Sequence, residues 1–496
     1  MRTLIFLFLF LSMSNECYAS FEMNSNMHKA YEHIMNLEFS QAENYINSEK
    51  KNNSSNGLII INENYIDFLK IIVGEEQEFF LESKKNKSNR LDALYKCDSE
   101  SPYYLFSQAE LHLQWAFARV KFKEYAQAAY ELQKAYRLLQ KNSKKFPEFI
   151  LNQKSLAVLQ ILIGSVPKSY SWIIDVIGLK GSIKSGFIQL YSFLEFTENS
   201  GDFKMYKLET LFLISFLEMN MSNDDDSYEK LIEIIGDSYL TSDLMKFCVA
   251  RLHSKLGQND LCIQILESES KAYEAYPLTY LQYLHAMSKM YKLDLKDSKF
   301  LFSAFLNDFK GRNYIKSAYN KLSLIAFLEE DSIKKDIYDS LSLTKGHALI
   351  DEDKQALNDV VNESLLNKEI LKSRLLYDGG YFIESKKILS LINTSNFNDS
   401  IFFIEYYYRY ARVSQKTGDS SRITLNLYTK VLSLIDDDNL YYLPMSALQI
   451  GLIYEKNNSL ELAKKYFYKC LEFQNFNYSN GIHQRATSGL NRIASI

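Results

Sequence analysis

A spacing of small and bulky residues recurs along this chain of 496 residues and constrains its fold more than any other feature. Each copy spans about 34 residues, with small residues at the eighth and twentieth positions and a bulky residue near the seventeenth. The small residues let two helices approach, and the bulky residue plugs the turn between them. Two copies are clear, and their residues are Ala116, Tyr125, Ala128 and Ala135 in one and Gly451, Tyr454, Ala463 and Phe467 in the other.

Weaker copies follow the same spacing and predict four more helix hairpins. Their residues are Ala30, Phe39 and Ala42; Ala250, Gly257 and Cys262; Ser373, Gly380, Phe382 and Ser385; and Ala411, Gly418 and Tyr428. Between the copies, apolar residues keep steps of three and four, as in Tyr314, Ala318 and Leu322, which indicates degenerate hairpins. Five prolines and 17 glycines are too few for the many turns of a sheet protein.

These patterns predict an all-α fold, an α-α superhelix or solenoid of helix hairpins. The core of a repeat array grows along one axis, so chain length does not set the number of domains. We expect a signal peptide at 1–19, an N-terminal degenerate helical-repeat region at 20–225 and a more regular C-terminal repeat region at 226–496. The alternative is one continuous solenoid from residue 20 onward.

The first residues have the pattern of a secretory signal. Arg2 supplies the charged start, residues 4–11 form an apolar run, and Ala19 ends a small-residue cleavage site. The run is far shorter than the roughly 20 residues that cross a bilayer. We therefore expect export with signal cleavage, no integral membrane segment afterwards, and a periplasmic or cell-envelope location, with secretion as the alternative.

Charge and cysteine content argue against nucleic acid as a partner and against disulfide bonds as a main support of the fold. The formal net charge of −4 gives no bulk attraction to nucleic acid, so we expect no nucleic-acid partner. Of five cysteines, Cys17 lies in the predicted signal, and the remaining four are few for a disulfide-supported exported protein. Cys248 and Cys262 fall on the two helices of one predicted hairpin, so the sequence allows either a bridge or two buried thiols.

The residues of the two clear copies resemble tetratricopeptide repeats. More broadly, the whole chain is similar to a family of exported bacterial tetratricopeptide-like proteins without assigned activity. The stretches that carry this likeness are residues 101–104, 108–116, 164–167, 309–316 and 377–381. The resemblance implies a tetratricopeptide-like fold and almost nothing about function.

No catalytic or metal-binding arrangement is recognisable in the sequence. The seven histidines pair neither with one another nor with cysteines at metal-ligand spacing. The nucleophile elbow, the phosphate-binding loop and the dinucleotide fingerprint are also missing. The aspartate runs at 224–226 and 436–438 lack the alternating ligands of a calcium loop and indicate solvated turns. We predict a protein that is not an enzyme and has no cofactor or metal.

One candidate partner-binding group is compact in sequence. Lys310, Arg312, Asn313 and Tyr314 combine basic, amide and aromatic side chains that suit the carboxylate of a partner through charge-assisted hydrogen bonds. The alternative is a helix start whose long side chains pack along their stems while their charges stay solvated.

Two further candidates are aromatic. The run from 402 to 410 holds six aromatic residues, more than one helical stripe accommodates, so Tyr406, Tyr407 and Tyr410 are expected to line a groove. Trp172 lies in a segment, residues 164–186, that contains four glycines and predicts a special helix turn.

Together these features predict a non-enzymatic scaffold or adaptor for protein–protein interactions in the cell envelope. Its concave side, formed by the first helices of the hairpins, is expected to bind a peptide or protein, with buried aromatic side chains supplying affinity. The alternative is a helical carrier or sensor for a small molecule or glycan fragment, with the Trp172 region or the tyrosine-rich run as its pocket.

Overall fold

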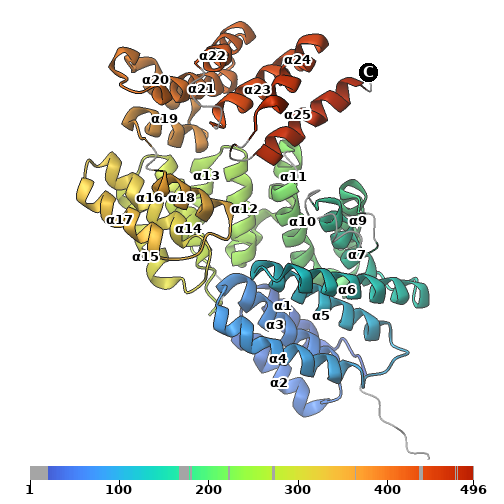
Figure 1. Cartoon of the computed structure of the whole chain (residues 1–496). Helices are drawn as coiled ribbons and strands as arrows, with labels where there is room; N and C mark the ends of the chain where they lie inside the picture. Colours follow the sequence, from blue (N-terminus) through green and yellow to red (C-terminus); the bar gives the residue numbers. More distant parts are fainter. Residues whose placement is uncertain are drawn as a thin grey trace, which may run out of the picture. The chain divides into compact units, whose positions relative to one another are not determined.

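The computed structural model describes residues 20–166, 178, 181–221, 224–270, 274–362, 365–434, 440–474, 476 and 479–494 (Figure 1). Across these ranges the regular elements are helices, and no β-strand is present. The predicted all-α fold is confirmed. The predicted signal peptide lies outside the described residues.

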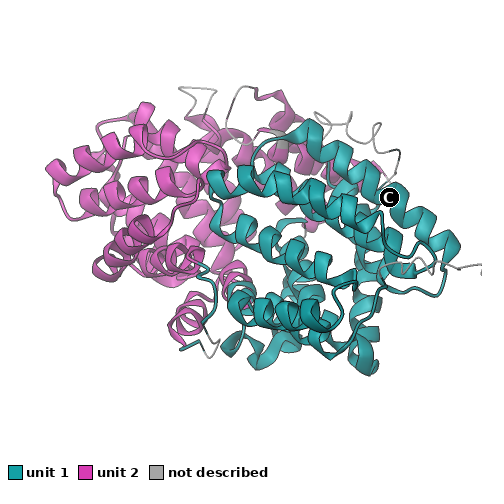
Figure 2. Cartoon of the chain, turned by 90° about the horizontal axis from the view of Figure 1, so that it is seen from below, with its two compact units in different colours: residues 1–248, 269–278 teal, residues 249–268, 279–496 magenta. Residues whose placement is uncertain are grey.

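The chain forms two compact units (Figure 2). Unit 1 comprises the chain up to Cys248 together with Glu269–Leu278, and unit 2 comprises Val249–Ser268 and Thr279–Ile496. The sequence places a division after residue 225, in a polar stretch. The units instead divide within helix α12 (Asp243–Lys255), where no linker composition marks the change.

Unit 1 holds the helices that precede α12. They are α1 (Ser25–Met35), α2 (Phe39–Asn52), α3 (Leu58–Gly74), α4 (Gln77–Leu94), α5 (Pro102–Lys121), α6 (Tyr125–Lys145), α7 (Leu151–Gly164), α9 (Ile183–Asn199), η2 (Gly201–Tyr206), α10 (Lys207–Met221), α11 (Asp225–Ile235) and η3 (Gly236–Leu240). Helix α5 is the centre of this unit, because almost every residue from Leu105 to Ala118 is buried, polar ones included.

Unit 2 holds the helices that follow α12. They are α13 (Asn259–Glu267), α14 (Tyr280–Tyr291), α15 (Leu295–Asp308), α16 (Ile315–Leu328), α17 (Ser332–Thr344), α18 (Asp351–Val361), α19 (Lys368–Asp378), α20 (Phe382–Leu391), η4 (Thr394–Asn396), α21 (Ser400–Lys416), α22 (Ser421–Ser433), α23 (Tyr442–Lys456), α24 (Leu460–Glu472) and α25 (Ser479–Ala494).

The same turn joins the two helices of hairpin after hairpin. One turn residue has a left-handed backbone, and the amide of the next residue donates to the carbonyl five positions earlier, as from Tyr381 to Leu376 at 2.9 Å. Among the described residues this turn occurs at Leu37, Lys123, Gly257, Leu293, Glu330, Gly380, Gly418 and Asn458. The hairpins α14/α15 and α16/α17, which the sequence indicates only as degenerate, therefore share the geometry of the clear copies.

Small residues bring the two helices of a hairpin together, as predicted. Ala116 and Ala128 are buried where α5 meets α6. In α19/α20 the hydroxyl of Ser385 donates to the carbonyl of Ser373 at 2.8 Å, twelve residues away in sequence. The bulky residue of the first clear copy, Tyr125, is 38% exposed at the start of α6.

In the C-terminal part of unit 2, α19 also contacts α21, α21 contacts α23, and α23 contacts α25, so that these four helices form a row. The core between α21 and α25 is continuous and contains Phe467, whose ring faces Gly451 and Gly489. In the described ranges, none of the helices combines the length and hydropathy needed to cross a membrane.

Candidate functional site: a charged cavity in unit 2

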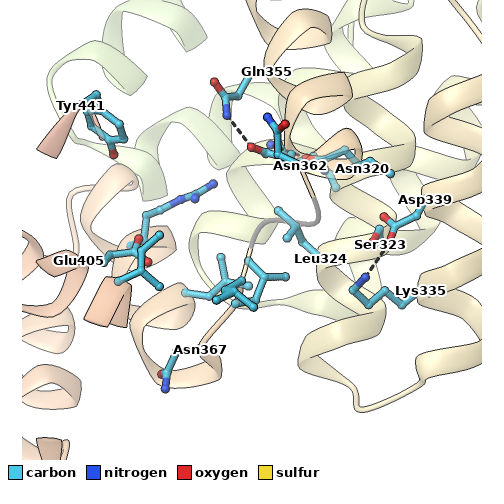
Figure 3. A pocket seen from close by; sticks show the side chains of 18 of the residues that line it. Asn320, Ser323, Leu324, Lys335, Asp339, Gln355, Asn362, Asn367, Glu405 and Tyr441 are labelled. Carbon is cyan, nitrogen blue, oxygen red and sulfur yellow. Dashed lines mark hydrogen bonds and ion pairs between the residues drawn. The ribbon is translucent and has the colours of Figure 1, made fainter. Parts of the chain in front are cut away.

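A cavity of about 1390 Å³ opens in unit 2. Its walls come from the first helices α16, α19 and α21, from α17 and α18, and from the start of α23. Figure 3 shows side chains from α16, α18 and α21 and from the residue before α23, among them Asn320, Gln355, Glu405 and Tyr441, around one open space. The row of first helices thus supplies much of the wall.

Among the residues that the structure describes, charged side chains of both signs line this cavity in equal number. The five cations are Lys321, Lys335, Arg374, Arg409 and Arg412, and the five carboxylates are Asp336, Asp339, Asp359, Asp378 and Glu405. Their formal charges cancel. The described part of the cavity wall is therefore polar and carries charges of both signs.

Three of the five cations already have partners. The Lys335 ammonium lies 2.6 Å from Asp339. The buried Arg409 donates to Glu405 at 3.0 Å and to the Tyr441 hydroxyl at 3.2 Å. The Arg412 guanidinium lies 4.3 Å from the centre of the Tyr377 ring, a cation–π contact. These three cations hold the walls of the cavity in place.

The other two cations have no carboxylate partner among the described residues. Arg374 forms no hydrogen bond or ion pair with any of them. The Lys321 ammonium donates only a long bond, 3.4 Å, to the side-chain oxygen of Asn320. Burial and the neighbouring Arg374 charge lower the pKa of Lys321 to about 8, with Asp359 and Asp378 opposing that shift. Burial and the Arg409 charge oppose the charged form of Arg374, but Asp378, Glu405 and Tyr441 outweigh them and raise its pKa.

Apolar side chains form another part of the wall. They are Leu324, Leu343, Val360, Leu365, Leu366, Leu371 and Ile401. Two of them, Leu343 and Leu365, are 43% and 52% exposed. Apolar surface of this kind gains about 25 cal/mol for each Å² that a ligand covers. The cavity thus offers both charge and apolar area.

The compact group at the start of α16 lies elsewhere in unit 2. Lys310 is exposed and donates to the carbonyl of Asn307 at 2.6 Å, and Arg312 is half-buried. Asn313 is buried, and the backbone amide of Tyr314 donates to Asp353 at 2.7 Å. None of these residues lines the cavity.

The Tyr314 ring packs among other tyrosines, with its centre 4.6 Å from the ring of Tyr280 and 4.8 Å from that of Tyr283. The next lysine, Lys316, is buried and donates to the carbonyls of Ser342 and Leu343, both at 2.8 Å. These contacts pack Tyr314 and Lys316 at the start of α16.

The aromatic run forms helix α21. Tyr406 is buried and makes edge contacts with Tyr407 and Tyr410 at ring-centre distances of 5.1 and 5.8 Å. The residues that α21 contributes to the cavity are instead Ile401, Glu405, Arg409 and Arg412. Trp172, the remaining sequence candidate, lies outside the described residues.

Sequence reasoning missed the cavity residues for two reasons. On α21 a signal was present, because Glu405, Arg409 and Arg412 follow one another at steps of four and three and so share a helix face. Lys321 and Arg374 gave no such signal, since they lie on different helices and come together only through packing.

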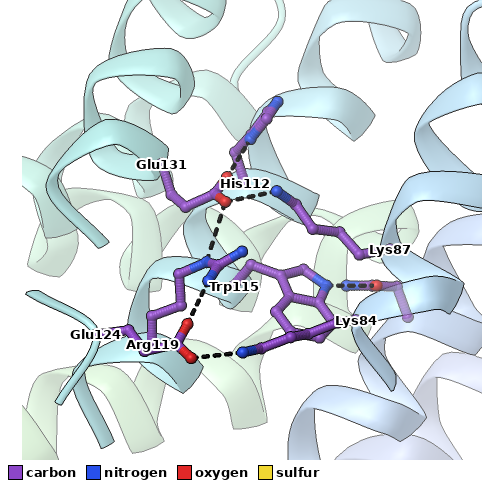
Figure 4. A network of polar contacts seen from close by, with 8 residues as sticks. Lys84, Lys87, His112, Trp115, Arg119, Glu124 and Glu131 are labelled. Carbon is purple, nitrogen blue, oxygen red and sulfur yellow. Dashed lines mark hydrogen bonds and ion pairs between the residues drawn. The ribbon is translucent and has the colours of Figure 1, made fainter. Parts of the chain in front are cut away.

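A second polar cluster lies in unit 1 (Figure 4). The carboxylate of Glu131, which is 2% exposed, accepts from Lys87 at 2.5 Å and Arg119 at 3.2 Å and contacts His112 at 2.5 Å. Arg119 and Lys84 also contact Glu124. Burial opposes the charged form of Glu131, but these partners outweigh it and lower its pKa. Each of the three cations has a carboxylate partner in the cluster, so the cluster joins α4, α5 and α6 as a structural element.

The cysteines and metal-ligand residues give no second site. Cys97, Cys248, Cys262 and Cys470 are buried free thiols, so Cys248 and Cys262 are not bridged. Burial raises the pKa of Cys97 and Cys262 to about 11 in each case. In the part of the chain that the structure describes, no three metal-ligating side chains gather.

Comparisons with known proteins add little to these observations. No family model and no curated protein matches the chain. The crystal structure of the APC/C hetero-tetramer Cut9–Hcn1 is similar at 10% identity and a TM-score of 0.27, over 92% of this chain and 95% of that one. The structure of Naa15/Naa10 bound to HypK-THB is similar at 13% identity and a TM-score of 0.23, over 94% and 65%. The description of the hairpins as tetratricopeptide-like rests on their own repeated turns and small-residue contacts.

Proposed function

We propose that this protein is a non-enzymatic scaffold and that the cavity of unit 2 binds a segment of a partner protein. The size of the cavity carries the proposal. Small-molecule sites usually enclose about 300–1,000 Å³, and this cavity of about 1390 Å³ exceeds that range. A stretch of polypeptide fills such a volume, with its backbone amides and carbonyls meeting the polar walls and its side chains meeting the leucines.

The walls suit a chain segment in a second respect. Asn320, Asn367 and Gln355 carry amide side chains that both donate and accept hydrogen bonds, as a peptide backbone requires. Asn367 accepts from the backbone amides of Glu369 and Ile370, both at 3.1 Å, and Gln355 donates to Asp359 at 2.5 Å, so these groups are positioned before a partner arrives. Such preorganisation reduces the ordering cost of binding.

Site-specific photo-crosslinking tests the proposal. A photoreactive amino acid at Asn362, an exposed residue of the cavity wall, is expected to capture a discrete partner from the protein's own cells. The matched control is Ile383 on α20, which is 68% exposed and outside the cavity. Capture from both positions alike, or from neither, contradicts a binding role for the cavity.

We further propose that the protein acts in the cell envelope after export. The charged start, the apolar run and Ala19 support this location. Cell fractionation followed by mass spectrometry of the N-terminus is expected to find a chain that begins at Ser20 in the envelope or periplasm. A chain that keeps Met1 and fractionates with the cytoplasm contradicts it.

A further inference from the structure

We propose that unit 1 contains a separate binding site, a pocket that takes a neutral ligand rich in hydroxyl groups, such as a mono- or disaccharide. The pocket has a volume of about 480 Å³, within the range of about 300–1,000 Å³ that small-molecule sites occupy. Residues of α2, α3 and α4 line it, all within 43–90, a stretch that the structure describes without a gap. This site is independent of the cavity of unit 2.

A fixed group of polar side chains forms part of the pocket wall. One carboxylate oxygen of Asp67 accepts from Arg90 at 2.7 Å and from Asn86 at 3.1 Å. The same nitrogen of Arg90 also donates to the side-chain oxygen of Asn64 at 3.2 Å. The side chains of Arg90 and Asp67 are only 12% and 15% exposed. They are therefore positioned before a ligand arrives, which lowers the ordering cost of binding.

This group keeps both donors and acceptors for a ligand. Among the described residues, the second carboxylate oxygen of Asp67, the side-chain oxygen of Asn86 and two of the three nitrogens of Arg90 form no hydrogen bond. Asn47 and Asn89, exposed at the same pocket, also have no partner in the described part of the chain. A hydroxyl group both donates and accepts, so neighbouring hydroxyls of a sugar ring can bond to carboxylate, amide and guanidinium groups together.

The charges of the wall favour a neutral ligand. Each charged side chain that lines the pocket already lies within 4.0 Å of an opposite charge. The pairs are Asp67 with Arg90 at 2.7 Å, Glu63 with Lys50 at 2.5 Å and Glu43 with Lys70 at 3.5 Å. A charged ligand finds no unpaired counter-charge in this wall, whereas a neutral ligand leaves all three pairs intact.

The apolar part of the wall is too small to hold an apolar ligand. It consists of Ile46 and Ile66, which are only 2% and 4% exposed. Burial at about 25 cal/mol for each Å² of apolar surface therefore contributes little here. None of the described residues that line the pocket is aromatic, so an aromatic or leucine side chain of a peptide gains little. A hydroxyl-rich ligand fits better, because its affinity comes from hydrogen bonds.

Saturation-transfer NMR on the full chain tests the site, because this method detects weak binding. The probes are glucose, N-acetylglucosamine and the β-1,4-linked disaccharide of each. We expect saturation transfer to the ring protons of at least one of these sugars. Absence of transfer to all of them overturns the inference and leaves the proposed function of the unit 2 cavity untouched.

Two asparagines of α2 give a matched pair of variants. Asn44 and Asn47 are both exposed and bond to no described residue, but only Asn47 lines the pocket. Asn47→Ala is expected to weaken sugar binding about threefold to tenfold, as the loss of one hydrogen bond does, and Asn44→Ala less than about twofold. Both variants should keep the unfolding midpoint of the natural protein, since neither side chain has a partner to lose.

Asn89→Ala on α4 is expected to act like Asn47→Ala, because Asn89 is also exposed at the pocket without a described partner. Equal effects of Asn47→Ala and Asn44→Ala, or no effect of either pocket variant, overturn the pocket as the sugar site.

Charged analogues of the sugars test the preference for a neutral ligand. Glucuronate carries a carboxylate on the glucose ring, and protonated glucosamine carries an ammonium group. Both are expected to bind no more tightly than the neutral sugars, whose affinity should change less than about twofold between low and high salt. Tenfold tighter binding of either charged analogue, or a steep salt dependence, overturns the assignment of a neutral ligand.

Discussion

Gly380 is expected to be far less tolerant of substitution than Gly418, although both occupy the same left-handed position of a hairpin turn. Their φ angles are +84° and +76°. A methyl group added at Gly380 would lie 1.9 Å from the carbonyl oxygen of Gly257, whereas one added at Gly418 meets nothing within 4 Å. The two substitutions therefore share a backbone cost and differ in one packing contact.

The magnitudes follow from this comparison. A side chain in the left-handed region lowers the free energy of unfolding by about 1–2 kcal/mol. Replacing glycine also reduces the entropy of the unfolded chain, which raises the free energy of unfolding by about 0.4–1 kcal/mol. Gly418→Ala is then expected to lose about 1 kcal/mol. Gly380→Ala adds the overlap with a backbone atom that cannot rotate away, and overpacking of this kind costs a further 1–3 kcal/mol, roughly.

Hydrogen exchange measured by mass spectrometry is the suitable assay, because a chain with two units need not unfold in one step. In Gly380→Ala, faster exchange is expected in α19, α20 and the turn that contains Gly257. In Gly418→Ala, a smaller increase is expected and should stay within α21 and α22. If Gly380→Ala is no less stable than Gly418→Ala, the inferred approach of the two turns is wrong.

Three further predictions concern the core, the charged cluster and the thiols. Phe467→Ala is expected to destabilise unit 2 by about 3–5 kcal/mol, because its ring is fully buried; urea unfolding measures this, and a loss below about 1 kcal/mol contradicts it. Glu131→Gln is expected to lower the free energy of unfolding by about 2–4 kcal/mol, which is less than the loss at a fully buried pair because the cationic partners of Glu131 reach water. Glu124→Gln is expected to lower it by less than about 1 kcal/mol. Since the pKa of Glu131 is lowered in the folded protein, its contribution is present above the unfolded value of about 4.3 and is lost as the pH falls through the folded pKa; an unchanged acid midpoint in Glu131→Gln refutes this. The four described cysteines are expected to resist a thiol reagent until the protein unfolds, and rapid labelling of the native chain contradicts their burial.

The sequence by itself determined the fold class, because the contact between two helices of a hairpin is local. Small residues twelve positions apart bring the helices together, whatever surrounds them, as Ala116 with Ala128 and Ser373 with Ser385 show. The identity of the left-handed turn residue did not decide which hairpins were recognisable, since Lys123 and Asn458 hold that position in the two clear copies. Leu293 and Glu330 hold it in α14/α15 and α16/α17.

Tertiary structure alone decided which polar residues form the candidate site. Lys310 and its neighbours stood out because they are adjacent in sequence, and of these residues Tyr314 directly precedes α16 and donates its backbone amide to Asp353. Lys321 and Arg374 belong to α16 and α19, and nothing in either helix alone distinguishes them from a solvated lysine and arginine. The energy of a charge depends on what surrounds it in space. Lys321 on α16 and Arg374 on α19 line one cavity although α17 and α18 separate their helices along the chain, so only the tertiary structure decides their surroundings.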